Sequence, residues 1–213
     1  MRVLGLVMIA ATVLFSCKKV DWSDLEEDTY QVQQRLDQGE TPFEIYQSGV
    51  PVDHIFGKIY QSGIIFYLDV ETGEGLVCSQ TDVYNELSEN YYNLLSNEPF
   101  TLPAGVTLQE GMGAGEYNTQ VLTGLLNESN NILSRIATLD SNSEWYLPSQ
   151  KELEAIHNNL HRLRLADFSL DYYWTSNIEG NQVVCIDFSR NDFPMPVLIQ
   201  PNGVAKARAV KKF

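Results

Sequence analysis

The chain has 213 residues, with 14 Lys and Arg against 28 Asp and Glu, which gives a formal net charge of −14 at pH 7. A surface this acidic repels phosphate backbones and anionic headgroups, so we expect no nucleic-acid partner. The length suffices for one domain with a sizeable core plus a tether.

Residues 1–16 have the features of a targeting segment. Arg2 supplies a positive start, an apolar run continues to Phe15, and the tetrapeptide LFSC ending at Cys17 has the form of a lipobox. The run is shorter than the roughly 20 residues that a membrane helix needs. We therefore predict a lipoprotein signal peptide, with a short buried strand as the other interpretation. Cys17 would carry acyl chains such as palmitate and hold the protein to a bacterial cell envelope, at the outer membrane or cell surface.

Residues 17–56 are predicted to form a lipidated, partly helical tether. Val32 and Leu36 lie at helical spacing, and Thr41 followed by Pro42 is typical of a helix start. The apolar stripe is thin. A solvated stalk is therefore favoured over a helix that binds a specific partner.

Residues 57–213 are predicted to form an α+β domain. Strands are expected at Ile59–Leu68, Leu76–Ser79, Val183–Ser189 and Val204–Val210, and helices at Val83–Leu95, Asn118–Leu139 and beyond Ser149. In Val183–Ser189, one face should be core and the other mixed. Alanine at every second position of the last strand lets a neighbour approach closely. Arg208 points the other way and is expected to pair with a buried carboxylate or carbonyl groups.

The helix beyond Ser149 is the best-defined element. Ser149 and Glu152 fit a capping box, which satisfies two backbone N–H groups at the helix start. Structural roles are expected for the preceding Trp145 and Pro148 and for Trp174. The predicted apolar stripe consists of Leu153, Ile156, Leu160 and Leu163.

Four blocks, WYLPSQKELEAI, YYWTS, VVCIDFS and ARAVKKF, occur in that order. Together they resemble the domain that closes the Legionella collagen-like adhesins and many bacterial surface lipoproteins, over about Gly57 to Phe213. Tyr146 and Lys211 stand where that family usually has arginine. The resemblance implies a C-type-lectin-like fold, with small antiparallel sheets and two to three helices, which is related to formylglycine-generating enzymes.

No catalytic constellation is apparent in the sequence, and we expect neither an enzyme nor a cofactor. The related formylglycine-generating enzymes hold copper with two nearby cysteines, whereas Cys78 and Cys185 are far apart in this sequence. These two cysteines either form a disulfide or remain buried thiols. His157 and His161 are four residues apart on the predicted helix, but no third ligand lies nearby in sequence, so no metal site is predicted.

Binding is the function that the resemblance implies. In this fold, ligands usually meet loops between strands, which here places candidate ligand-binding residues at Arg190, Asn191, Asp192, Phe193 and Asn177. We expect a glycan or another envelope partner, as in adhesion or recognition. The alternatives are a structural envelope or assembly protein without a small ligand, and a degenerate enzyme of the formylglycine-generating type.

Overall fold

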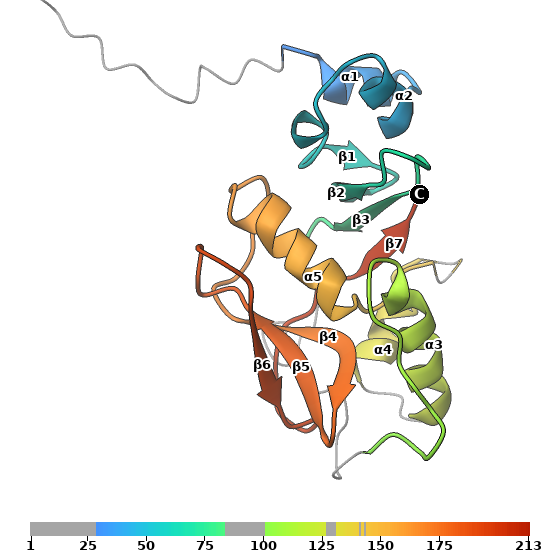
Figure 1. Ribbon diagram of the computed structural model, residues 1–213, viewed down its shortest axis with the longest axis vertical. Coiled ribbons are helices and arrows are strands. Elements are labelled where there is room, and N and C mark those ends of the chain that lie inside the picture. The colour runs from blue at the N-terminus through green and yellow to red at the C-terminus, as the bar shows by residue number, and fades with distance from the viewer. Residues whose placement is uncertain (1–28, 84–100, 127–130, 141, 143) are drawn as a thin grey trace, which may run out of the picture.

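The computed structural model describes residues 29–83, 101–126, 131–140, 142 and 144–213. Within them, two small antiparallel sheets and five short α-helices form an α+β architecture (Figure 1). Helix α5 lies between the two sheets, with α3 and α4 to one side. No helix in these ranges is long and apolar enough to cross a membrane. The predicted signal peptide and Cys17 lie outside the described residues.

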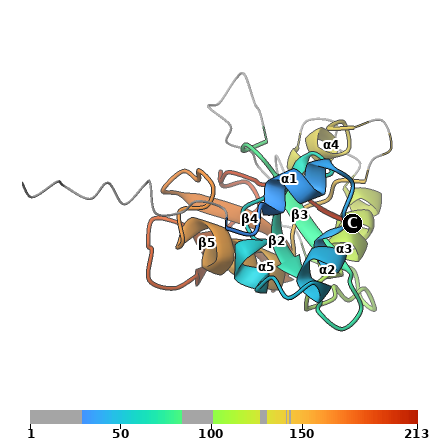
Figure 2. The same cartoon turned by 90° about the horizontal axis from the view of Figure 1, so that it is seen from above.

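The N-terminal helices cover the first sheet. They are α1 (Val32–Asp37), α2 (Pro42–Gln47) and the 3₁₀ turn η2 (Val52–His54). The predicted start at Thr41 is confirmed, because its side chain and that of Glu44 form a capping box. The expectation of a solvated tether is wrong from Val32 onward. Val32, Ile45 and Ile55 are fully buried in the same core as the sheet residues, and Figure 2 shows the helices above it.

The first sheet has the strand order β1-β2-β3-β7. Its strands are β1 (Ile59–Tyr60), β2 (Gly63–Leu68), β3 (Gly75–Ser79) and β7 (Val210–Lys212). The single strand predicted over Ile59–Leu68 is instead a hairpin, since Gln61 and Ser62 turn the chain with φ of 45° and 68°.

The strand predicted over Val204–Val210 is replaced by an irregular segment that links the two sheets. Ala209 O accepts a hydrogen bond from Ser79 N, and Ala207 O accepts one from Val83 N. On the other side, Lys206 O accepts one from Trp174 N. The backbone pairs alternately with two neighbours, so a regular strand begins only at Val210. The alanines are fully buried, which agrees with the predicted close approach.

The second sheet consists of β4 (Tyr172–Glu179), β5 (Gln182–Asp187) and β6 (Met195–Ile199), in that order. The mixed face expected for β5 is wrong, since both faces are buried. Ile186 packs in one core with Leu153 of α5, whereas Cys185 packs in a second core with Trp174. The sheet therefore separates the two cores.

The remaining helices are α3 (Ala114–Leu125), α4 (Ile132–Ile136) and α5 (Gln150–Ile156), and α5 continues as the π-helix η3 (His157–His161). The single helix predicted over Asn118–Leu139 is wrong, since α3 ends at Leu125 and α4 begins at Ile132, and Asn118 does not cap α3. It lies buried inside the helix, where its side chain pairs with the backbone of Gln109. The predicted inward position of Leu163 is also wrong, because this residue follows η3 and is 50% exposed. The helix predicted over Val83–Leu95 lies outside the described residues from position 84 on.

Candidate ligand-binding site

The carboxylate of Glu152 joins three separate segments. Its Oε1 accepts hydrogen bonds from Gly113 N and the Tyr146 hydroxyl, both at 3.0 Å. Its Oε2 accepts from Ser149 N at 2.6 Å and Gly115 N at 3.2 Å. Burial raises the pKa of Glu152, and the hydrogen bonds oppose that shift. The capping box predicted at Ser149 is confirmed, and its glutamate also fixes the start of α3 beside Tyr146, which bridges to Val210 of β7.

Arg208 forms a second buried set of polar contacts between distant segments, and its pairing inside the domain was predicted from the sequence. It is 2% exposed, and its Nη2 lies 2.8 Å from the Asp82 carboxylate. The guanidinium also donates to the carbonyl groups of Ser79, Gln80 and Asp167. The buried charge is thus paired and its donors are used, so Arg208 is bound within the domain.

A pocket of about 430 Å³ opens between α3, α4 and the segment of Trp145. We call it the Trp145 pocket; its residues include Glu116, Gln120, Thr123, Gly124, Glu144 and Trp145. Leu133 and Ala137 of α4 add apolar surface. Its volume falls within the range of about 300–1,000 Å³ that is typical of small-molecule sites.

Some polar side chains of the Trp145 pocket already form hydrogen bonds or ion pairs within the protein, and others do not. Glu116 forms an ion pair with Lys212 at 2.6 Å. Thr119 exchanges hydrogen bonds with the backbone of Leu147. Gln120 and Thr123 are exposed and make no hydrogen bond to any other described residue through their side chains. An amide and a hydroxyl, both able to donate and accept, therefore face the pocket.

A second hollow of about 460 Å³ adjoins the first, because Glu144 and Trp145 line both. The Lys211 ammonium lies 5.0 Å from the Trp145 ring centroid and 3.8 Å from the Glu144 carboxylate. Trp145 is 9% exposed. This tryptophan, expected to be structural, is thus a wall between two concave surfaces as well.

The structure does not bring the predicted ligand-binding residues together. Arg190, Asn191, Asp192 and Phe193 lie exposed in the loop between β5 and β6. Asn177 lies near the opposite end of this sheet, since Ile178 pairs with Val183 while Asp187 pairs with Met195. Asn177 lies within β4, and its side chain accepts from Gln150 N and donates to Gln109 O, so it ties this strand to the start of α5 and to the loop of Gln109.

Cys78 and Cys185 are both buried free thiols, so the disulfide alternative is not present in this structure. They belong to different cores, Cys78 with α5 and Cys185 with Trp174. Burial raises the pKa of Cys78 to about 12 and that of Cys185 well above its usual value. Neither thiol ionises readily at neutral pH.

The pocket residues of α3 were not predicted from the sequence. Glu116, Gln120, Thr123 and Gly124 recur at helical spacing and form a polar stripe that the sequence contains. Because the predicted helix began at Asn118, Glu116 lay outside it and the stripe was not recognised. No protein-family model matches the chain, and no curated protein matches it significantly.

Proposed function

We propose that this protein is a lipid-anchored bacterial envelope protein that binds a glycan in the Trp145 pocket. The C-type-lectin-like fold belongs to the proposal, supported by the block series and by an α+β architecture with two small antiparallel sheets. Anchoring is supported by the lipobox that ends at Cys17.

The pocket chemistry is the observation that carries the glycan proposal. A sugar ring presents hydroxyl groups around its edge and C–H groups on its faces. Gln120 and Thr123 offer unused donors and acceptors, and Ala137 and the edge of Trp145 offer apolar surface close by. A few convergent polar groups on an apolar wall are the usual composition of a ligand site.

Gly124 provides a sharp test. It lies four residues after Gln120 and hence on the same face of α3. A Cβ at Gly124 would meet no atom within 4 Å, so the helix can accept a side chain there. Gly124→Met should place a flexible chain over the pocket, whereas Gly124→Ala adds only a methyl group.

The full chain, purified in detergent, is screened on a glycan array, and the best glycan is titrated by calorimetry. We expect Gly124→Met and Gln120→Ala to weaken binding at least about tenfold, a loss of about 1.4 kcal/mol. Gly124→Ala should bind normally, and so should Tyr117→Ala, because Tyr117 is exposed but does not line the pocket. The absence of any glycan hit would refute the proposal. Loss of binding in Arg190→Ala, with the pocket variants unaffected, would move the site to the β5–β6 loop.

A second candidate is an assembly partner in the envelope without a small ligand. It is favoured by exposed apolar side chains around β6, where Phe193, Met195 and Leu198 are 51%, 37% and 46% exposed. This function predicts no glycan hit and co-purification with another envelope protein.

A further inference from the structure

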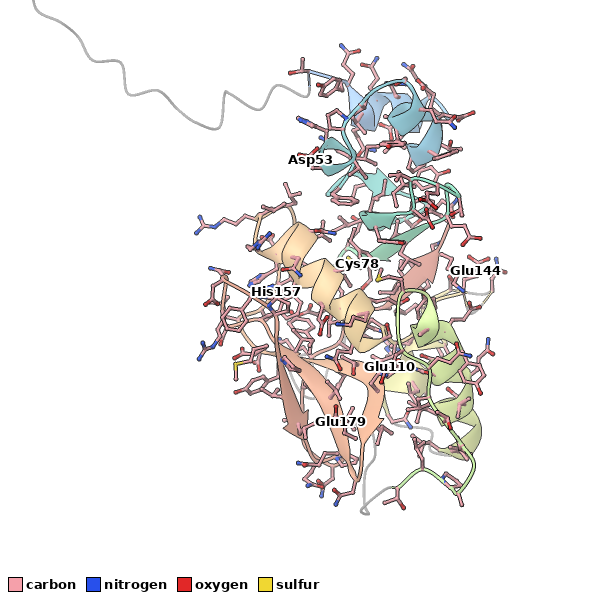
Figure 3. All side chains as sticks on the ribbon, in the orientation of Figure 1. Asp53, Cys78, Glu110, Glu144, His157 and Glu179 are labelled. Carbon is pink, nitrogen blue, oxygen red and sulfur yellow. The ribbon has the colours of Figure 1, made fainter. Side chains whose placement is uncertain are left out.

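Two histidines lie side by side in the π-helical segment η3. His157 and His161 are 0% and 6% exposed, and their ring centroids are 5.0 Å apart. Both rings also pack against Phe188, the residue that follows β5, with ring centroids 5.0 Å apart. π-Helical segments are rare and occur frequently at functional sites. Figure 3 shows His157 on the opposite side of the molecule from Glu144, which lines the Trp145 pocket.

The hydrogen bonding of this pair is incomplete. His157 Nε2 lies 2.8 Å from the carbonyl oxygen of Arg190. A carbonyl only accepts, so Nε2 must carry the proton, and in a neutral imidazole Nδ1 is then a bare acceptor. Nδ1 of His157 and Nε2 of His161 are both buried without a partner among the described residues. Such atoms are uncommon in folded proteins and call for an explanation.

Metal binding does not supply that explanation. A zinc site needs at least three protein ligands, and the described part of the chain contains no group of three His, Cys, Asp or Glu side chains placed to hold an ion. The unpartnered nitrogens are instead positions where a proton would add. Whether a proton adds there depends on the free energy of placing a positive charge on these buried imidazole rings.

The surroundings oppose a positive charge on the pair. Burial lowers the pKa of His157, and burial followed by the charge of His157 lowers the pKa of His161. Arg162, at the end of η3, acts in the same direction on His157. The hydrogen bond to the Arg190 carbonyl favours the charged form of His157, as do Asp192 of the loop and Asp187 of β5, but each is a weaker influence than burial.

We propose that His157 and His161 form an acid-sensitive latch that holds the β5–β6 loop, residues 188–194, against η3 at neutral pH and releases it on protonation. The latch contact is the hydrogen bond from His157 to the carbonyl of Arg190. A second proton on His157 would place an N–H where no acceptor lies, next to a second imidazole. Opening the loop exposes both rings to water and removes that cost.

The direction of the pH effect follows from the linkage between protonation of the histidines and opening of the loop. The open state has ordinary histidine pKa values near 6.5, and the closed state has lower ones, so the open state binds more protons in between. Closure is therefore fully favoured above about pH 6.5 and weakens as the pH falls through this window. The loop carries Arg190 and Phe193, so acid would alter how these exposed side chains are presented.

Hydrogen exchange of the full chain, followed by mass spectrometry at pH 7.5 and pH 5 and corrected for intrinsic exchange, tests the latch. We expect protection of residues 188–194 to fall about tenfold or more at pH 5. The His157→Gln/His161→Gln double variant keeps a side-chain N–H but cannot titrate, so it should lose this pH response. His54→Gln, which changes the exposed third histidine, should keep it.

Two results would overturn the latch. One is equal loop protection of the native chain at both pH values, and the other is a pH response that persists in the double variant. If the double variant does not fold, NMR titration of the native imidazole C–H signals decides the matter. Signals of His157 and His161 that titrate below the ordinary histidine pKa of about 6.5 support the latch, whereas ordinary titration of both contradicts it.

Discussion

Replacing Glu152 by glutamine tests whether an ionised carboxylate holds three segments together. All four partners donate: Gly113 N and the Tyr146 hydroxyl to Oε1, and Ser149 N and Gly115 N to Oε2. An amide in the same place must turn its NH₂ toward one of these pairs. The less unfavourable orientation faces Oε1, because the Tyr146 hydroxyl can rotate and accept whereas the N–H of Gly113 cannot.

The expected loss can be assembled from these contacts. An N–H left without its acceptor costs about 1–3 kcal/mol, and the two hydrogen bonds to Oε2 each weaken by about 1 kcal/mol when the charge is removed. Relief from burying a charge offsets part of this. We expect Glu152→Gln to lower the free energy of unfolding by about 3 kcal/mol, a large share of the about 5–15 kcal/mol of a typical domain.

Equilibrium urea unfolding at pH 7.5, followed by tryptophan fluorescence, measures this difference. Glu154→Gln on the same helix is the matched control, because its partners are the neighbouring side chains of Gln150 and of Lys151, a surface cation whose side chain is 59% exposed. That variant should stay within about 1 kcal/mol of the native chain. Equal unfolding free energies of the two variants would refute the reasoning. They would mean that the buried carboxyl group is already protonated at this pH.

Two further predictions concern α3 and the membrane. Gly115→Ala should destabilise the protein, because its Cβ would lie against the Glu152 carboxylate and only 2.6 Å from Leu147 O, whereas Gly124→Ala, with open space, should gain about 0.5–1 kcal/mol. Thermal unfolding of both variants checks the opposite signs, and a stabilised Gly115→Ala would contradict the packing described. Cys17→Ser should move the protein from the membrane pellet to the soluble fraction after cell lysis, because the proposed acyl chains can no longer be attached. A variant that still pellets would rule out lipid anchoring through this thiol.

Local signals predicted the elements that depend on neighbours in sequence. The capping boxes at Thr41 and Ser149 are confirmed, since each needs only a side chain and a backbone group three residues apart. The buried pairing of Arg208 is confirmed too, because an arginine between small buried residues must find acceptors. The sequence did not identify Asp82 as its partner, since the two are far apart along the chain.

The errors occur where long-range packing overrides a local pattern. Asn118 has the chemistry of a helix cap, but tertiary contacts bury it within α3 against Gln109. The thin stripe of Val32 and Leu36 indicated a stalk, yet a few apolar residues suffice when a sheet supplies the opposite surface. Asn177 was expected in a loop but lies within β4, whereas Arg190 lies in the β5–β6 loop, and only strand register places the two at opposite ends of one sheet.

The sequence by itself determined the helix starts at Thr41 and Ser149, the α+β class, the acidity and the paired histidines four residues apart, because each is local or additive along the chain. Only the tertiary structure decided that α3, α4 and Trp145 enclose a pocket and that His157 meets the backbone of Arg190. Such contacts join residues that are distant in the chain. Their positions follow from how the two sheets and α5 pack, which no local pattern specifies.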